Sequence, residues 1–154
     1  YFEHKALYRS TSGMVDAAPF EVEIGKAAVV QAGEDMSIVS YGAGVHWALE
    51  YAKLHAEISI EVIDLRSLSP LDFDAIKKSV VKTNRLLVLH EDNLTGGIGA
   101  EIAAWVSENC FKHLDAPVMR CASVDTPIPF SPELEQQFLA KARLHDAIRR
   151  LINY

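Results

Sequence analysis

Short apolar runs of β type alternate along this sequence with segments whose apolar residues recur at helical spacing, and this alternation is the strongest constraint on the fold. Strands are predicted at Ala27–Gln31, Met36–Tyr41, Ile60–Leu65, Arg85–His90 and Pro117–Val124. Helices are predicted at Val45–Ala56, Pro70–Asn84, Ile98–Phe111 and Ala142–Asn153. Such alternation indicates a three-layer α/β/α sandwich around a mostly parallel sheet.

The first two strands are separated only by Ala32-Gly33-Glu34-Asp35, which is a turn-rich junction. This spacing predicts that Ala27–Gln31 and Met36–Tyr41 pair as an antiparallel hairpin. The expected fold is therefore a five-stranded mixed sheet whose first strand is antiparallel to the other four.

Charged residues, Gly and Pro interrupt every periodic pattern between Tyr1 and Ile24. Residues 1–24 are therefore expected to be a tail or linker, and residues 25–154 to form one domain. A chain of 154 residues with 49% hydrophobic residues suits one domain with a true core. The first residue, Tyr1, is not Met, so a fragment or processed product is expected.

Composition argues against several classes of function. A net charge of −6 makes a nucleic-acid surface unfavourable, because phosphate binding needs clustered Lys and Arg. No apolar stretch approaches the length of a membrane span, so no membrane contact is expected. The two cysteines, Cys110 and Cys121, lack the spacing of a metal site and are expected to be reduced core thiols in a cytosol-like compartment.

The motif "HEDNLTGGIGAE" from His90 to Glu101 links a predicted strand to a predicted helix. Ligands bind at such positions in open α/β sheets, and helix N-termini attract anions, so nucleotide binding is one interpretation. Its glycines do not follow the dinucleotide or P-loop pattern. Gly96, Gly97 and Gly99 are also consistent with a tight turn and close helix packing, or with a surface that contacts another subunit.

The same motif begins with His90-Glu91-Asp92, the one place where an imidazole is adjacent to carboxylates in the sequence. A histidine at a strand end can act as a general base. Adjacent strand residues point to opposite faces, however, so His90 and Glu91 are not expected to form a dyad, and a structural role for His90 is the alternative. No nucleophile motif is present, so no catalytic, cofactor-binding or metal-binding residue is predicted.

Four motifs occur in the order typical of one family: "EVIDLRSLSPLD" from Glu61, "LVLHEDNLTGGIGAEIAAWV" from Leu87, "LDAPVMR" from Leu114 and "DTPIPF" from Asp125. From about Gly25 onward the chain resembles the C-terminal domain of the β subunit of thiamine-diphosphate-dependent 2-oxo acid dehydrogenases, which is related to the transketolase C-terminal domain. The segment "FEHKALYRS" at Phe2–Ser10 is similar to the end of the preceding pyrimidine-binding domain. Asp92-Asn93 stands where the family usually has Ala-Pro, which changes the rigidity and charge of the loop.

The resemblance implies strand order 1-3-2-4-5 and an enzyme that decarboxylates a 2-oxo acid and acylates a lipoyl arm. "ENCF" at Glu108–Phe111 and "AIRRLINY" at Ala147–Tyr154 look more like the branched-chain enzyme than the pyruvate enzyme. A pyruvate or acetoin dehydrogenase, a transketolase-like synthase and a stand-alone nucleotide-binding oxidoreductase are the alternatives.

In this family, thiamine diphosphate and Mg bind outside the domain represented here. The resemblance therefore implies a role in assembly, with an α subunit and a second β subunit as partners in an α2β2 heterotetramer. It also implies that the basic subunit-binding domain of a dihydrolipoyl acyltransferase docks at Asp115 and at the carboxylate of Tyr154. The alternative is that Asp115 is simply a turn residue before Pro117. The expected location is the cytoplasm, or the mitochondrial matrix in a eukaryote.

Overall fold

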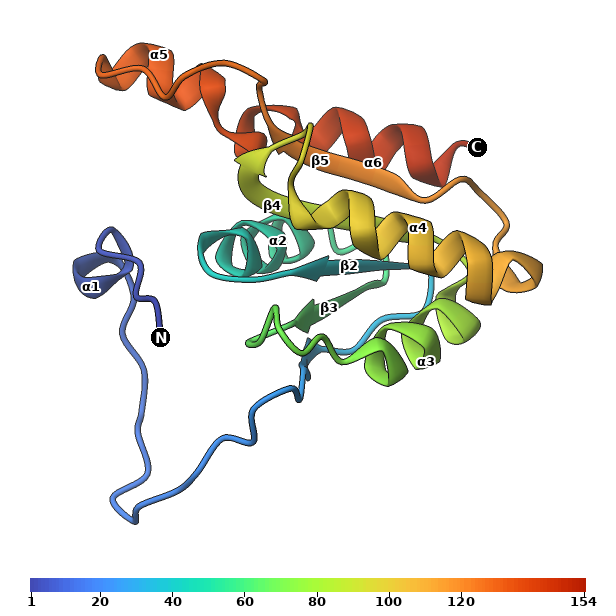
Figure 1. The fold of residues 1–154 in the computed structure, drawn as a ribbon, viewed down its shortest axis with the longest axis horizontal. Helices are drawn as coiled ribbons and strands as arrows, with labels where there is room; N and C mark the ends of the chain where they lie inside the picture. The colour runs from blue at the N-terminus through green and yellow to red at the C-terminus, as the bar shows by residue number, and fades with distance from the viewer.

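A computed structural model describes residues 1–154 as an α/β/α sandwich with a tail at the N-terminus (Figure 1). The strands are β1 (Ala28–Gln31), β2 (Met36–Ser40), β3 (Ile60–Asp64), β4 (Leu86–Asn93) and β5 (Met119–Ser123). The α-helices are α1 (Leu7–Ser10), α2 (Ala43–Leu54), α3 (Phe73–Thr83), α4 (Ile98–Cys110), α5 (Pro132–Phe138) and α6 (Leu144–Ile152). Two 3-10 turns, η1 (Phe111–His113) and η2 (Ala140–Arg143), follow α4 and precede α6.

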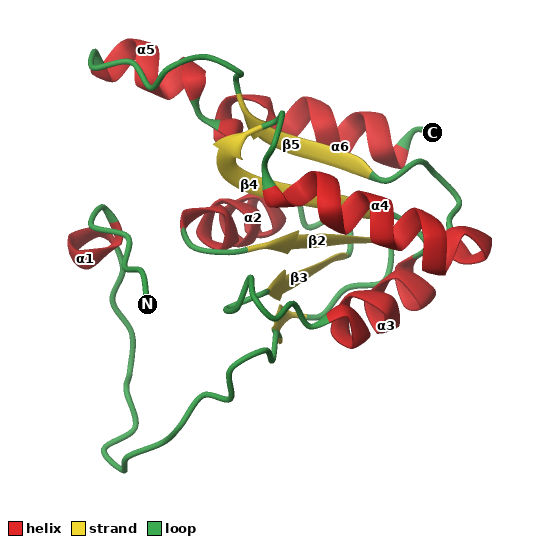
Figure 2. Cartoon of the chain, in the orientation of Figure 1, coloured by secondary structure: helices red, strands yellow, loops and turns green.

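The five strands form one sheet in the order β1-β3-β2-β4-β5 (Figure 2). Strands β2, β3, β4 and β5 are parallel, and β1 is antiparallel to its neighbour β3. The mixed sheet, the antiparallel first strand and the strand order are therefore confirmed.

The predicted hairpin between Ala27–Gln31 and Met36–Tyr41 is wrong, because β1 pairs with β3 and not with β2. The connection after β1 crosses the start of β3: a Cβ atom built on Gly33 would lie 2.1 Å from the carbonyl carbon of Ile60. The backbone N–H of Glu34 and of Asp35 both donate to the Ser59 carbonyl oxygen. Because β3 enters between the two strands, it pairs with both of them, which a two-strand hairpin would not allow.

Each face of the sheet is covered by two helices, and each face has its own core. The α2 and α6 face buries residues such as Ile38, Leu89 and Ile148, whereas the α3 and α4 face buries Val39, Ile76 and Ile102. The side chains of β4 are divided between these two cores, which explains the continuous apolar run in its sequence.

Helix α3 begins at Phe73, three residues after the predicted start at Pro70, and ends at Thr83, one residue before the predicted end. The Asp72 carboxylate accepts hydrogen bonds from the backbone N–H of Ala75 at 3.1 Å and of Ala27 at 3.0 Å. Burial alone would raise the pKa of Asp72, but these two donors together with the charges of Lys26 and Lys78 lower the pKa. Asn84 ends the helix in the left-handed conformation with φ of 58°.

The other helices differ from expectation mainly at their ends. Helix α4 stops at Cys110 and continues as η1, and the closing helix is divided into η2 and α6. Helix α5 was not expected, although Pro132 stands at its first position, where proline favours a helix start. The two cysteines are buried and unbonded, and burial raises the pKa of Cys121 to about 11, so that this thiol stays protonated.

Residues 1–24 extend away from the sandwich and contain only α1 (Figure 1). Apart from the local bond from the Lys26 N–H to the Glu23 carbonyl oxygen, their one hydrogen bond to the domain is between the imidazole of His4 and the Glu91 carboxylate, at 2.8 Å. The division into a linker and one domain remains a prediction. None of the helices has the length and apolar character needed to cross a membrane.

Candidate functional site

The carboxyl end of β4 and the loop after β5 are joined by a set of short polar contacts. The Asp125 carboxylate accepts hydrogen bonds from the Thr95 backbone N–H at 2.9 Å and from its hydroxyl at 2.6 Å. The side-chain amide of Asn93 donates to the carbonyl oxygens of Val124 and Thr126. The Thr95 hydroxyl lowers the pKa of Asp125, which therefore stays ionised. These contacts explain why the "LTGG" and "DTPIPF" segments belong to one structural unit.

A shallow hollow of about 490 Å³ lies between these two loops. Its lining includes the carboxylates of Asp92 and Asp125 and contains no Lys, Arg or His. Two carboxylates without a cation repel a phosphate group, although the hollow is near the N-terminus of α4. The geometry therefore does not favour the nucleotide interpretation of the glycine motif.

The glycines allow α4 to begin directly against His90. A Cβ atom built on Gly97 would lie 2.6 Å from Cε1 of His90, and one built on Gly99 would lie 2.4 Å from its Nε2. Gly96 has φ of 82°, a conformation that favours glycine. Of the interpretations made from sequence, the tight turn with close helix packing is therefore confirmed.

His90 is 0% exposed, and neither of its ring nitrogens has a hydrogen-bond partner. Burial lowers the pKa of His90, so the imidazole is neutral at physiological pH. Glu91 lies on the opposite face, where it contacts His4 instead. His90 and Glu91 do not form a dyad, as the alternation of strand side chains predicts.

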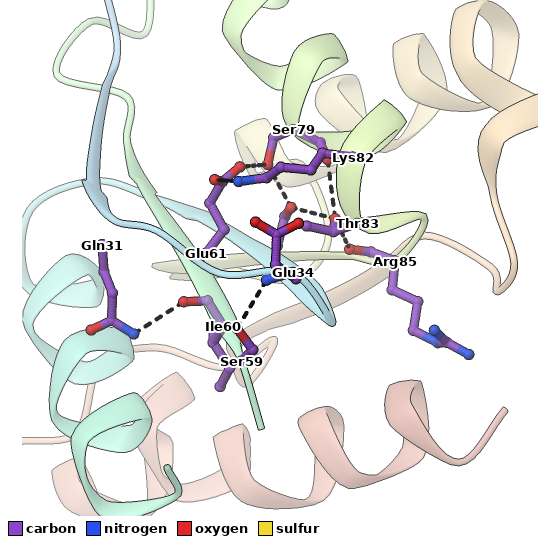
Figure 3. A network of polar contacts seen from close by, with 10 residues as sticks. Gln31, Glu34, Ser59, Ile60, Glu61, Ser79, Lys82, Thr83 and Arg85 are labelled. Carbon is purple, nitrogen blue, oxygen red and sulfur yellow. Dashed lines mark hydrogen bonds and ion pairs between the residues drawn. The ribbon is translucent and has the colours of Figure 1, made fainter. Parts of the chain in front are cut away.

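A second polar cluster, which the sequence analysis missed, lies between α3 and the start of the sheet (Figure 3). The carboxylate of Glu61 on β3 is almost completely buried and accepts hydrogen bonds from the Ser79 hydroxyl, at 2.5 Å, and from the Lys82 ammonium group. The Ser37 hydroxyl contacts those of Ser79 and Thr83. The signal was a charged residue between two apolar residues of a strand, Glu61, together with polar α3 residues spaced three and four apart.

This buried cluster does not have the character of a catalytic site. Ser79 lies beside a carboxylate and a lysine, but neither it nor Glu61 is exposed beyond 3%. Neither residue lines the hollow at the carboxyl ends of β4 and β5. The cluster therefore attaches α3 to β2 and β3, with every member satisfied by a polar neighbour.

The two residues predicted to bind a partner are both on the surface. Asp115 is exposed, its backbone N–H donates to the Asn84 carbonyl oxygen at 2.9 Å, and its carboxylate forms no ion pair or hydrogen bond. Tyr154 is 72% exposed. The chain end lies at the end of the sandwich where β5 begins (Figure 1). The structure contains no group of three or more His, Cys, Asp or Glu side chains arranged to hold a metal.

Comparison with known proteins agrees with the fold. The family model "Transketolase, C-terminal domain" matches residues 25–143. The chain is 40% identical to the β subunit of 2-oxoisovalerate dehydrogenase from Bacillus subtilis, over 100% of this chain and 48% of that protein. It is 44% identical to the β subunit of the pyruvate dehydrogenase E1 component from the same organism, over 85% of this chain and 41% of that protein.

A solved structure of a split gene transketolase, an inactive β4 tetramer, matches 92% of this chain and 48% of its own with a TM-score of 0.75 and 27% identity. The chain thus spans less than half the length of these relatives. The family model covers all five strands of the sandwich, from before β1 to the end of η2, and stops before α6. The chain therefore belongs to the transketolase C-terminal domain family.

Proposed function

We propose that this chain is the C-terminal domain of the β subunit of a 2-oxo acid dehydrogenase that acts on branched-chain 2-oxo acids. The observation that carries the proposal is the similarity to a 2-oxoisovalerate dehydrogenase β subunit along the whole chain. The pyruvate enzyme is the second candidate, because a pyruvate dehydrogenase β subunit is similarly identical over a shorter stretch. The "ENCF" and "AIRRLINY" segments favour the branched-chain substrate.

The domain acts in assembly and not in the chemical step. Thiamine diphosphate needs cationic or N–H groups for its diphosphate, and Mg needs a set of oxygen ligands. The hollow at the carboxyl ends of β4 and β5 has two carboxylates and no basic side chain, and no metal-binding cluster exists. The residues of this hollow do not fit the diphosphate, so the cofactor would be held by the remainder of the β subunit and by the α subunit.

The partners in this proposal are an α subunit, a second β subunit and the subunit-binding domain of a dihydrolipoyl acyltransferase. A basic partner domain suits a chain with a net charge of −6, because opposite charges speed the encounter. The carboxylates of Asp115 and of the C-terminal Tyr154 provide two exposed anions for it. Neither group is used in an ion pair within the chain.

The docking role is tested with the full-length β subunit assembled with its α subunit. Asp115→Ala should weaken binding of the acyltransferase's subunit-binding domain, by about 2–5 kcal/mol if the charge pair is buried. Asp74→Ala removes an exposed carboxylate from α3 and serves as the control. Decarboxylation with an artificial electron acceptor should be unchanged in both variants. Unchanged partner binding by Asp115→Ala and by a variant without Tyr154 would place the docking surface elsewhere.

The substrate is tested separately with the assembled wild-type enzyme. A higher kcat/KM for 3-methyl-2-oxobutanoate than for pyruvate is expected, and the reverse order would favour the pyruvate enzyme. A thermal-shift measurement with nucleotides addresses the remaining alternative. Stabilisation of the chain by a nucleotide at micromolar concentration would contradict the assembly role.

A further inference from the structure

A groove of about 840 Å³ follows the outer edge of β5 and is separate from the carboxylates proposed for docking. One wall is formed by residues 120–126, and the other by Arg143 and one side of α6. The sheet order ends with β5, so one side of this strand has no strand partner (Figure 1). Unpaired backbone groups of an edge strand are a template for another chain.

The groove concentrates positive charge on an acidic protein. Four of the seven arginines of the sequence line it, namely Arg120, Arg143, Arg149 and Arg150, against two aspartates. None of these arginines forms an ion pair within the chain. Their charge is therefore available to a ligand.

Two of the arginines are held in place by neutral backbone oxygens. The Arg120 guanidinium donates to the Leu94 carbonyl oxygen at 2.8 Å. The Arg143 guanidinium donates to the carbonyl oxygens of Ala122 at 3.1 Å and Phe138 at 2.6 Å. Such bonds position a guanidinium without neutralising it. The other two arginines are on the exposed surface of α6.

Only the far end of the β5 edge is covered by the chain itself. The Ala122 carbonyl oxygen accepts from Arg143, and the Val124 N–H donates to the Phe138 carbonyl oxygen. Because backbone groups alternate in direction along a strand, the N–H and C=O of Arg120 point outward in the same way. No strand covers them, so the start of β5 remains open for pairing.

We propose that this groove binds an extended acidic segment of another polypeptide, which adds to the sheet as a strand beside β5. The open start of β5, from Met119 to Cys121, spans about 10 Å at the rise of a β-strand, so about three residues of the peptide would pair with it and the rest would lie along the arginines of the groove. Alternate carboxylates on such a strand face the same side and can meet the arginines of α6. A single small anion would reach only part of this row of arginines.

The test uses fluorescence anisotropy of the 154-residue chain with a labelled peptide of alternating Glu and Val. This peptide should bind at about 50 mM salt, where screening is weak, and a peptide of alternating Lys and Val should not. Arg149→Glu with Arg150→Glu should weaken binding by at least about tenfold. Lys77→Glu with Lys78→Glu makes the same charge change on exposed residues of α3 and should leave binding unchanged. Equal binding by the wild type and the Arg149→Glu, Arg150→Glu variant would overturn the proposal.

Strand pairing is tested by N-methylation of the peptide at alternate residues, which removes the N–H groups along one of its edges without altering the protein. One of the two methylation patterns should abolish binding and the other should preserve it. Equal binding of both methylated peptides would exclude a strand beside β5. Displacement of the peptide by inorganic phosphate, but not by chloride of equal ionic strength, would identify a small-anion site and would also overturn the proposal.

Discussion

Replacement of Gly99 by Ala tests whether close packing against His90 explains the glycine motif. The added Cβ would lie 2.4 Å from Nε2 and 2.7 Å from Cδ2 of His90, and 3.4 Å from Cγ1 of Val88. The imidazole is 0% exposed, so it cannot move into solvent without opening the core. Overpacking of this kind costs about 1–3 kcal/mol, and the helix propensity of alanine returns up to about 1 kcal/mol.

The expected result is a net loss of about 1–2 kcal/mol in the free energy of unfolding, or a Tm lower by about 2–8 °C for a chain of this size. Urea unfolding followed by circular dichroism measures this, and the m-value should be unchanged. Gly13→Ala is the matched control, because nothing lies within 4 Å of a Cβ at that position. Its effect should stay within about 0.5 kcal/mol.

A double-mutant cycle with His90→Ala identifies the cause. His90→Ala is itself destabilising because it leaves a cavity, but it removes the atoms that a Cβ on Gly99 would contact. In this background Gly99→Ala should be neutral or stabilise the protein by up to about 1 kcal/mol, which corresponds to a coupling energy of about 1–3 kcal/mol. An equal cost of Gly99→Ala in both backgrounds would refute the packing argument.

Three further predictions concern stability, each measured by urea unfolding. Asp72→Ala should cost about 1–2 kcal/mol, because it removes the acceptor for the N–H groups of Ala75 and Ala27, whereas the exposed Asp74→Ala should cost less than about 0.5 kcal/mol. Lys82→Met should cost about 1–3 kcal/mol, because it leaves the buried Glu61 carboxylate without its cation. Adding Glu61→Gln should restore most of this loss. If stability is not restored, the pairing of Lys82 with Glu61 is contradicted. Burial lowers the pKa of His90 in the folded state, whereas in the unfolded state this pKa keeps its ordinary value of 6.5. As pH drops below about 6.5, the unfolded state therefore binds a proton that the folded state does not, and the free energy of unfolding should fall. His90→Gln should reduce this pH dependence, and an unchanged profile would contradict a neutral buried imidazole.

Elements with strong local signals were predictable from the sequence. Asp72 and Asn84 mark the two ends of α3. The Asp72 side chain accepts a hydrogen bond from an N–H of the first turn, and Asn84 adopts the left-handed conformation that ends a helix. The continuous apolar run of β4 is typical of a strand covered on both faces, and its first five residues are buried. The resemblance of four motifs added the strand order, which no local signal contains.

The candidate sites divide in the same way. The separation of His90 from Glu91 follows from the alternation of side chains along one strand. The contact of His90 with Gly97 and Gly99 required the position of α4 on the sheet. The Glu61 cluster joins two strands to one helix, so only the assembled sandwich places its residues together.

The sequence by itself therefore determined where the five strands and helices α2, α3, α4 and α6 form, which of their faces are apolar and to which family the chain is similar. These properties depend on dihedral preferences and on periodicity over a few residues. The tertiary structure alone decided that β1 pairs with β3 and that Arg120 and Arg149 line one groove. Both outcomes depend on contacts between residues far apart in the chain. In the first of them, β2 and β3 compete to pair with the same edge of β1. Local sequence signals cannot rank such long-range pairings, because their energies arise only when the sheet and its helices are packed.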